Sequence, residues 1–369
     1  MIVDRIILFP YYLCLKIRHA LYDSGLKKIR CAEVPVISIG NVTVGGTGKT
    51  PHTEMVLRTL MSDPLWRGRN LAVLSRGYRR KSRGFQNVTV DGSAAFYGDE
   101  PLQIKKKFPF VTVAVDKDRV EGCRFLADPR LLESDKKARR CIDKNIPRAD
   151  IIVLDDGFQY RKLRPAVSIV LVDYNRPVFK DSLMPLGRLR DLEERILQAD
   201  IIIVSKCPHY VDDNERQRWR KNLKIGQESH LFFTTIDYCT LEPVYPECEN
   251  RYLYSKRLVL FSGIANDTPL LKYLSDTYKV VKHLKFPDHH KFSGADMHRI
   301  EAVSKEYPTA IITTTEKDCQ RVKDYAQTPA AVKERLFRAP IQVSFLGDGE
   351  HERFRSVLRS YLTESHSEH

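Results

Sequence analysis

The stretch GNVTVGGTGKTP, residues 40–51, links an apolar run, VISI, to a segment with the composition of a helix. Strand, glycine-rich loop and helix in this order form the context in which phosphate-binding loops occur. The glycines allow successive backbone N–H groups to converge on an anion, and the helix adds the positive end of its dipole. The loop is a variant, because Thr43 occupies the position of the first glycine of the strict pattern. An incidental glycine-rich turn is the alternative.

The loop defines a candidate site for ATP. Lys49 would reach the β- and γ-phosphates, and the Thr50 hydroxyl would bind Mg²⁺. The predicted ATP-binding residues are Gly45, Gly46, Thr47, Gly48, Lys49 and Thr50.

A second element, IIVLDDGFQ at residues 151–159, is an apolar strand that ends in two carboxylates. In P-loop enzymes a carboxylate at such a strand end supports the metal, often through a bound water. Asp-Asp-Gly also makes an ordinary turn, but together with the upstream loop it indicates a nucleotide site. We therefore predict that Thr50, Asp155 and Asp156 hold Mg²⁺, without deciding which carboxylate is nearer to the metal.

Apolar runs of strand length alternate with polar, helix-like segments along the chain. This pattern predicts a P-loop NTPase-like α/β fold with a mostly parallel sheet and helices on both faces. After about residue 255 a second set of runs predicts a smaller α/β unit, and residues 231–245 and 341–345 are predicted to pair as a ribbon between the two units. The predicted parts are an interfacial helix (1–30), a P-loop core (31–230), a β-ribbon linker (231–257 and 340–347), a C-terminal α/β domain (258–339) and a C-terminal helix and tail (348–369).

The net charge of +14, from 61 Lys and Arg against 47 Asp and Glu, favours a polyanionic partner such as a phosphorylated ligand, nucleic acid or an anionic membrane surface. The eight cysteines include no Cys-x-x-Cys pair. That spacing argues against a zinc site or a short disulfide framework and fits a reduced cytosolic compartment.

Residues 1–30 resemble a targeting segment, but the charge-free run from Ile6 to Leu15 is shorter than the roughly 20 residues that a membrane-spanning helix needs. Apolar residues recur every three or four positions with Lys and Arg nearby. This spacing predicts an interfacial helix, bent at Pro10. A helix docked on the core of the protein is the alternative.

Seven motifs occur in the order and approximate spacing of the tetraacyldisaccharide 4'-kinases, a family that the chain resembles up to about residue 320. They are GNVTVGGTGKTP, SRGY (75–78), GDEP (98–101), VAVDKDR ending at Arg119, DDGFQ (155–159), FPDHH (286–290) and TTEKD (314–318). The resemblance implies an ATP-dependent kinase for the 4'-hydroxyl of a tetraacylated glucosamine disaccharide 1-phosphate, in lipid A (lipopolysaccharide) synthesis. It further implies action at the cytosolic face of the inner membrane of a Gram-negative bacterium.

The resemblance also implies roles for single residues. Lys49 would be catalytic as well as ATP-binding, and Asp99 with His289 would assist the sugar hydroxyl. We hypothesise that His289 approaches Asp99 when the domains close, with an imidazolium orienting the carboxylate. The candidate substrate residues are Asn41, Arg76, Tyr78, Arg119 and Gln159.

Some of these residues have other readings. Asp99 could instead cap the helix that begins at Glu100, and His289 with His290 could be loop residues or half of a metal site. The chain departs from the family motifs at Tyr160, where a His is common, and at Lys117, which interrupts a Gly-Pro.

Two other functions compete with a lipid kinase. A P-loop GTPase or partitioning-type ATPase would act as a switch, but Val44 replaces the signature lysine of the partitioning group, and Ser205-Lys206-Cys207-Pro208 lacks the aspartate that reads guanine. A nucleic-acid-binding ATPase would use the positive charge, but no binding module is recognisable. We therefore expect an acylated disaccharide and an anionic membrane as partners, no nucleic acid, and a monomer.

Overall fold

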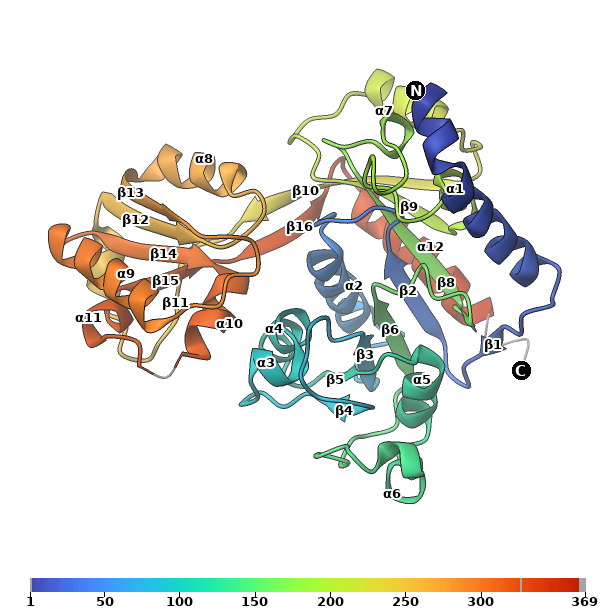
Figure 1. The fold of residues 1–369 in the computed structure, drawn as a ribbon, viewed down its shortest axis with the longest axis horizontal. Coiled ribbons are helices and arrows are strands. Elements are labelled where there is room, and N and C mark those ends of the chain that lie inside the picture. The colour runs from blue at the N-terminus through green and yellow to red at the C-terminus, as the bar shows by residue number, and fades with distance from the viewer. Residues whose placement is uncertain (1, 326, 365–369) are drawn as a thin grey trace.

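The computed structural model describes residues 2–325 and 327–364, and for residues 2–7 and 364 it describes the backbone alone. The chain forms a large unit and a small unit joined by two long strands (Figure 1). The large unit contains a nine-stranded sheet in the order β16-β10-β9-β8-β2-β6-β3-β5-β4. Its parallel strands are β2 (Val36–Gly40), β3 (Leu71–Ser75), β5 (Thr112–Val115), β6 (Ile151–Asp155), β8 (Val167–Asp173), β9 (Ile201–Ser205) and β10 (His230–Tyr238). The edge strands β4 (Gln86–Asn87) and β16 (Ile341–Phe345) are antiparallel.

Helices cover both faces of this sheet, as the sequence predicts. Successive side chains of a strand point to opposite faces, so Ile37 packs in the cluster of α2 (Lys49–Ser62) and α12 (Glu350–Glu364), whereas Val36 packs with α5 (Arg119–Ala127). Because both faces are covered, the strands are apolar at nearly every position. The continuous apolar runs in the sequence therefore have a direct structural cause.

The small unit contains a five-stranded sheet in the order β11-β15-β14-β12-β13. Its strands are β11 (Glu242–Pro243), β12 (Arg257–Ser262), β13 (Lys279–Lys285), β14 (Ile311–Thr315) and β15 (Leu336–Ala339). Its helices are α8 (Thr268–Thr277), α9 (Gly294–Glu306), α10 (Glu316–Lys323) and α11 (Ala330–Lys333). The C-terminal part of β10, Thr234–Tyr238, pairs with Ile341–Phe345 of β16. The predicted ribbon is therefore present but shorter than residues 231–245, because residues 231–233 pair with β9 in the large sheet and β11 pairs with β15 in the small one.

The remaining elements are short, apart from α1, α4 and α7. They are α1 (Ile2–Asp23), β1 (Arg30–Cys31), α3 (Ala94–Tyr97), α4 (Asp99–Lys107), α6 (Leu131–Ser134), β7 (Leu163–Arg164), α7 (Asp213–Asn222) and the 3₁₀ turns Lys136–Ala138, Val178–Lys180, Glu193–Gln198 and Asn250–Tyr254. Within the described part of the chain, no helix combines the length and apolar character needed to cross a membrane.

Candidate active site between the two units

The phosphate-binding loop connects the end of β2 to the start of α2, at the carboxyl end of the parallel strands, where ligands bind in sheets of this class. Gly45 has a φ of 106° and Gly48 a φ of 88°, values that residues with a side chain rarely adopt. Gly48 is the N-cap of α2, and Lys49 is its first residue. The structure thus places a helix N-terminus and a lysine at the loop, as a phosphate site requires.

Asn41, a candidate substrate residue, is fully buried within the loop. Its amide donates to Thr47 Oγ1 (2.8 Å) and to Thr43 Oγ1 (3.3 Å), and its carbonyl oxygen accepts from Arg190 (2.7 Å). The threonine that replaces the usual glycine is therefore part of an internal support of the variant loop. A contact between Asn41 and a substrate stays a prediction.

Ser205 and Lys206 also support the loop. Lys206 donates to the carbonyl of Gly46 and to the carboxylate of Asp173, the latter at 2.7 Å. Ser205 Oγ donates to the carbonyl of Thr47 (2.9 Å). The segment that resembles a guanine-reading motif in the sequence thus binds the backbone of the phosphate loop.

His52 in α2 connects the loop to β10. Its Nδ1 donates to the carbonyl of Gly48 (2.7 Å), and its Nε2 accepts from Thr234 Oγ1 (2.9 Å). Burial of the ring lowers the pKa of His52 to about 4. A neutral imidazole therefore links the phosphate loop to the strand that continues into the small unit.

Asp156 follows β6 with a φ of 59°, and two cations face its carboxylate. Arg190 Nη2 lies 2.5 Å and Lys49 Nζ 3.8 Å from Asp156 Oδ1. Burial acts to raise the pKa of Asp156, but the charges of Lys49 and Arg190 outweigh it and hold the pKa below its ordinary value. The side chain is therefore an anion at neutral pH.

Asp155, at the end of the same strand, has a different environment. Its side chain is buried, and Thr53 Oγ1 donates to it at 3.4 Å. Burial, together with the negative charges of Glu100 and Asp156, raises the pKa of Asp155 to about 7. A carboxyl group in this state gains from a nearby dication, because the added charge favours its ionised form. The chemistry of the donor set, a hydroxyl at Thr50 and two carboxylates, therefore fits Mg²⁺.

Asp99 and His289 come together across the interface of the two units. Asp99 is the first residue of α4, and His289 lies in the loop after β13 with a φ of 59°. His289 Nδ1 is 3.7 Å from Asp99 Oδ2, and Arg321 Nε donates to that oxygen at 2.8 Å. The two residues are thus neighbours, and the hypothesis that closure of the domains on ATP brings them together stays a prediction. The capping alternative is wrong, because Gly98 is the N-cap of α4 and no side chain caps this helix.

Three further pairs join α4 to α10 beside these residues. Together with Asp99–Arg321 they form what we call the α4–α10 seam: Glu100–Lys317 (2.9 Å), Lys106–Gln320 (2.7 Å) and Lys107–Glu316 (3.3 Å). Lys107 Nζ also lies 2.7 Å from Glu54 in α2. The helix that carries the phosphate site, the helix that carries Asp99 and the small unit are therefore linked by charged contacts.

Of the other candidate substrate residues, Tyr78 borders the cavity between the two units. Tyr78 is exposed, and its ring centroid is 6.1 Å from that of His289. Arg119 is buried over the ring of Tyr160, with its Nε unpaired among the described residues. Gln159 Nε2 is also buried without a partner in the described part of the chain. Arg76 is exposed. Buried unpaired donors indicate a missing ligand or water, so a substrate role for Arg119 and Gln159 stays a prediction.

The two departures from the family motifs and the second histidine have structural roles. Tyr160 donates to Asp118 at 2.7 Å, and the carbonyl of Lys117 accepts from Arg119. His290 Nε2 lies 2.9 Å from Asp296. Across residues 2–325 and 327–364 no group of three or more His, Cys, Asp or Glu residues is placed to hold a metal. Within these residues, His289 and His290 therefore have no further ligands with which to form a metal site.

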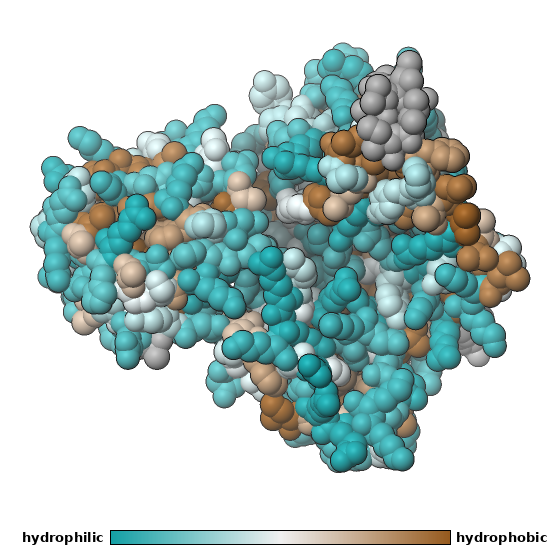
Figure 2. Space-filling view, in the orientation of Figure 1, coloured by the Kyte–Doolittle hydropathy of each residue, from teal (hydrophilic) through white to brown (hydrophobic). Residues whose placement is uncertain are grey.

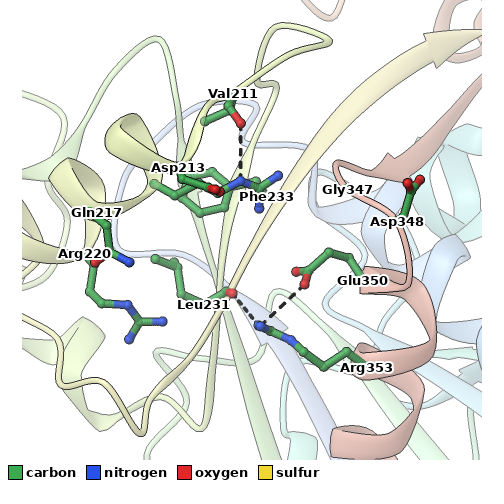
Figure 3. A pocket seen from close by; sticks show the side chains of 11 residues that line it. Val211, Asp213, Gln217, Arg220, Leu231, Phe233, Gly347, Asp348, Glu350 and Arg353 are labelled. Atoms are coloured by element: carbon green, nitrogen blue, oxygen red, sulfur yellow. Dashed lines mark hydrogen bonds and ion pairs between the residues drawn. The ribbon is translucent and has the colours of Figure 1, made fainter.

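Two cavities lie in different places. One of about 290 Å³ opens between the units and is bordered by Tyr78, Asp99, Glu100, His289 and Arg321, among others. A larger cavity of about 410 Å³ lies between α7, β10 and the start of α12, and none of the candidate site residues lines it. Its Arg353 points to the carbonyl of Leu231, to which it donates at 2.7 Å (Figure 3). Size alone therefore does not identify the active site.

Helix α1 is docked on the large unit by one side and exposed on another. Leu15 and His19 are buried, and His19 Nε2 lies 2.6 Å from Asp191. Phe9, Leu13 and Ile17 are 57%, 44% and 51% exposed, and Figure 2 shows apolar surface along this helix. The two sequence-based readings of the segment, a docked helix and an interfacial helix, are thus compatible.

The sequence analysis does not include four residues that make contacts in the site. They are Glu100, Arg190, Lys317 and Arg321. Glu100 and Lys317 lie within the motifs GDEP and TTEKD, so the motifs were a usable signal for them. Arg190 lies in residues 183–191, a segment that resembles one of the family and whose basic residues suit an anionic substrate, although it could also be a simple loop. Arg321 carries no such signal, because it reaches Asp99 from a segment distant in sequence.

Comparisons with known proteins identify the family of the chain. Residues 5–363 match the model of a family described as tetraacyldisaccharide-1-P 4'-kinase. A protein of Phocaeicola vulgatus named tetraacyldisaccharide 4'-kinase is 37% identical over 94% of this chain and 91% of its own length. One of Parabacteroides distasonis with the same name is 36% identical over 96% and 92%. A crystal structure of LpxK from Aquifex aeolicus in complex with ATP is similar with a TM-score of 0.69 and 26% identity, covering 97% of this chain and 99% of that one.

Proposed function

Because the chain belongs to the tetraacyldisaccharide-1-phosphate 4'-kinase family, we propose that the cleft between its two units transfers the γ-phosphate of ATP to the 4'-hydroxyl of an acylated glucosamine disaccharide 1-phosphate. The hydroxyl oxygen forms a bond to the γ-phosphorus, the bond from that phosphorus to the β,γ-bridging oxygen breaks, and ADP leaves. The proton of the hydroxyl passes to the carboxylate of Asp99.

The observation that carries the proposal is the meeting of residues from both units at one cleft. The large unit supplies the phosphate loop, Lys49 and Asp99, and the small unit supplies His289, whose Nδ1 is 3.7 Å from Asp99 Oδ2. Burial raises the pKa of Asp99, but the contacts of His289 and Arg321 outweigh it, so the net pKa lies below the ordinary value. The carboxylate is ionised and can accept the proton as the new bond forms.

The candidate residues divide by role. Lys49 and the backbone of Gly45, Gly46, Thr47, Gly48 and Thr50 bind ATP. Thr50, Asp155 and Asp156 would hold Mg²⁺, which when bound neutralises charge on the phosphates. Arg76, Tyr78, Arg119 and Gln159 would contact the sugar or its phosphate. In support, Tyr78 borders the cavity between the units, and Arg119 and Gln159 have buried donors without a partner among the described residues.

The exposed side of α1 would contact the membrane that contains the acylated substrate. Its exposed apolar residues and the net charge of +14 suit an anionic surface at the cytosolic side of the inner membrane. We expect a monomer there, with α1 as a peripheral anchor.

The direct test is transfer of radiolabelled γ-phosphate from ATP to an acylated disaccharide 1-phosphate in mixed micelles with Mg²⁺. We expect a 4'-phosphorylated product with the wild-type protein and none without the lipid. ATP hydrolysis that is unaffected by the lipid, without a phosphorylated lipid product, would instead support a switch ATPase.

A further inference from the structure

Arg321 of α10 ends at the Asp99–His289 pair and contacts both partners. Its Nε and Nη2 each lie 2.8 Å from Asp99 Oδ2, and its Nη2 lies 3.1 Å from His289 Nδ1. We propose that Arg321 is a positioning residue for phosphoryl transfer, which selects the oxygen of Asp99 and the nitrogen of His289 that face the substrate. The inference rests on the proposed function of that pair.

The first consequence concerns Asp99. Both nitrogens of Arg321 bind the same carboxylate oxygen, Oδ2. Among the described residues, no hydrogen bond to Oδ1 is found, and Asp99 borders the cavity of about 290 Å³ between the units. Charge-assisted bonds to one oxygen restrict rotation of the carboxylate. Oδ1 is thereby left for the hydroxyl of the substrate, in a fixed orientation.

The second consequence concerns the tautomer of His289. A guanidinium group can only donate hydrogen bonds, so Nδ1 must be the acceptor from Arg321 and carries no proton. The proton of the neutral ring is then on Nε2. The separation of 3.7 Å between Nδ1 and Asp99 Oδ2 is longer than an ordinary hydrogen bond. In this proposal the cation that orients Asp99 is the guanidinium, in place of the imidazolium of the sequence-based hypothesis.

The supports of Arg321 lie within the small unit. Its Nη1 donates to the carbonyl of Gly263 (3.1 Å) and to Asp318 Oδ1 (2.9 Å). Asp318 Oδ2 accepts from the backbone of Gly263 (2.8 Å) and from Thr315 (2.7 Å). Because none of these groups belongs to the large unit, the small unit presents a preorganised guanidinium to Asp99 and His289.

A purely structural role would make Arg321 one more contact of the α4–α10 seam. Lys106 provides the matched comparison, since its 2.7 Å bond to Gln320 also crosses the seam but touches neither Asp99 nor His289. Loss of a seam contact would weaken the closed arrangement, whereas loss of a positioning residue would lower turnover in the complex that has already formed.

The kinetic test uses Arg321→Lys, Arg321→Ala and Lys106→Met in the lipid phosphorylation assay. Misplacement of a reacting group costs about 100-fold, so we expect kcat of both Arg321 variants to fall by about that factor with the KM for ATP nearly unchanged. Added guanidinium chloride, well below denaturing concentration, should restore part of the kcat of Arg321→Ala. Lys106→Met should keep kcat near the wild-type value. Wild-type kcat in Arg321→Lys would overturn the proposal.

A second test needs no substrate, so it separates this inference from the proposed function. Nitrogen-15 NMR of histidine-labelled protein distinguishes protonated from unprotonated ring nitrogens, and His289→Gln assigns the signal. We expect an unprotonated Nδ1 in the wild-type protein and a mixture of tautomers in Arg321→Lys. A protonated Nδ1 in the wild type would overturn the proposal. This result does not depend on Arg321→Ala, so it holds even if that variant does not fold. A wild type with the expected tautomer but without lipid phosphorylation would contradict the proposed function alone.

Discussion

The phosphate-binding loop and the α4–α10 seam both bring charged side chains to one cleft, but their geometry has different origins. The loop depends on neighbours in sequence, since two left-handed glycines and the start of α2 place Lys49. The seam depends on the docking of two units, because Asp99 and Arg321 are 222 positions apart. Binding of ATP should therefore be separable from activation of the sugar hydroxyl, and substitutions in the two regions should have different kinetic signatures.

The largest effect is expected in the loop. Lys49→Ala removes the charge at the phosphates, and loss of one such preorganised donor costs up to about 1000-fold in kcat. The fold should survive, because Lys49 begins a helix at the cleft and Arg190 still pairs with Asp156 when the lysine is removed. Initial rates of lipid phosphorylation and a thermal unfolding curve check both statements. Lys272→Ala, at an exposed position of α8, is the control, and near-wild-type turnover of Lys49→Ala would contradict the loop assignment.

The support of the loop by His52 can be tested through pH. The pKa of the buried ring is about 4, against 6.5 for the unperturbed group. As the pH falls below 6.5 the unfolded chain takes up a proton that the folded chain refuses, so the free energy of unfolding decreases until pH 4 is reached. The full loss is about 3 kcal/mol.

Urea unfolding between these pH values compares the wild type with His52→Gln. The glutamine variant should lack this part of the pH dependence, and His298→Gln, whose side chain is 80% exposed, should keep it. Equal pH dependence in the wild type and in His52→Gln would show that the loop does not hold a neutral imidazole.

The same contrast between local and distant contacts explains what the sequence could reveal. The loop, the strand that ends in Asp155 and the alternation of apolar runs are local patterns, and the structure has them at the predicted places. The support of the loop by Lys206 and the cation at Asp156 from Arg190 depend on how β9 and the segment before Glu193–Gln198 lie in the fold. Whether Asp99 caps α4 depends on the backbone conformation of Gly98, which is the N-cap and has a φ of 103°. No local sequence pattern specified this conformation.

The coupling of the two units at the site is tested by a double-mutant cycle. Asp99→Ala and His289→Ala should each lower kcat by about 100-fold, with little change in the KM for ATP, because neither belongs to the loop. The double variant should lose much less than the product of the two effects, since the residues share Arg321 and act together. His290→Ala is the control, as it contacts Asp296 and not Asp99. Fully multiplicative losses would show independent roles.

The smallest effect is expected for a substitution in α1. This helix belongs to neither region, and we propose that it binds the enzyme to the membrane. Ile17 is 51% exposed beside Leu13, so Ile17→Asp should leave the fold intact. A charge at this position opposes insertion of the apolar side into a lipid interface and adds repulsion from anionic headgroups. Loss of one buried isoleucine corresponds to about 2 kcal/mol, so cosedimentation with anionic vesicles should weaken by about 30-fold, while phosphorylation of a micellar substrate should change by less. Ile142→Asp introduces the same charge at a residue that is 71% exposed in the large unit and should not alter vesicle binding. Equal binding by all three proteins would mean that the exposed side of α1 does not contact the membrane.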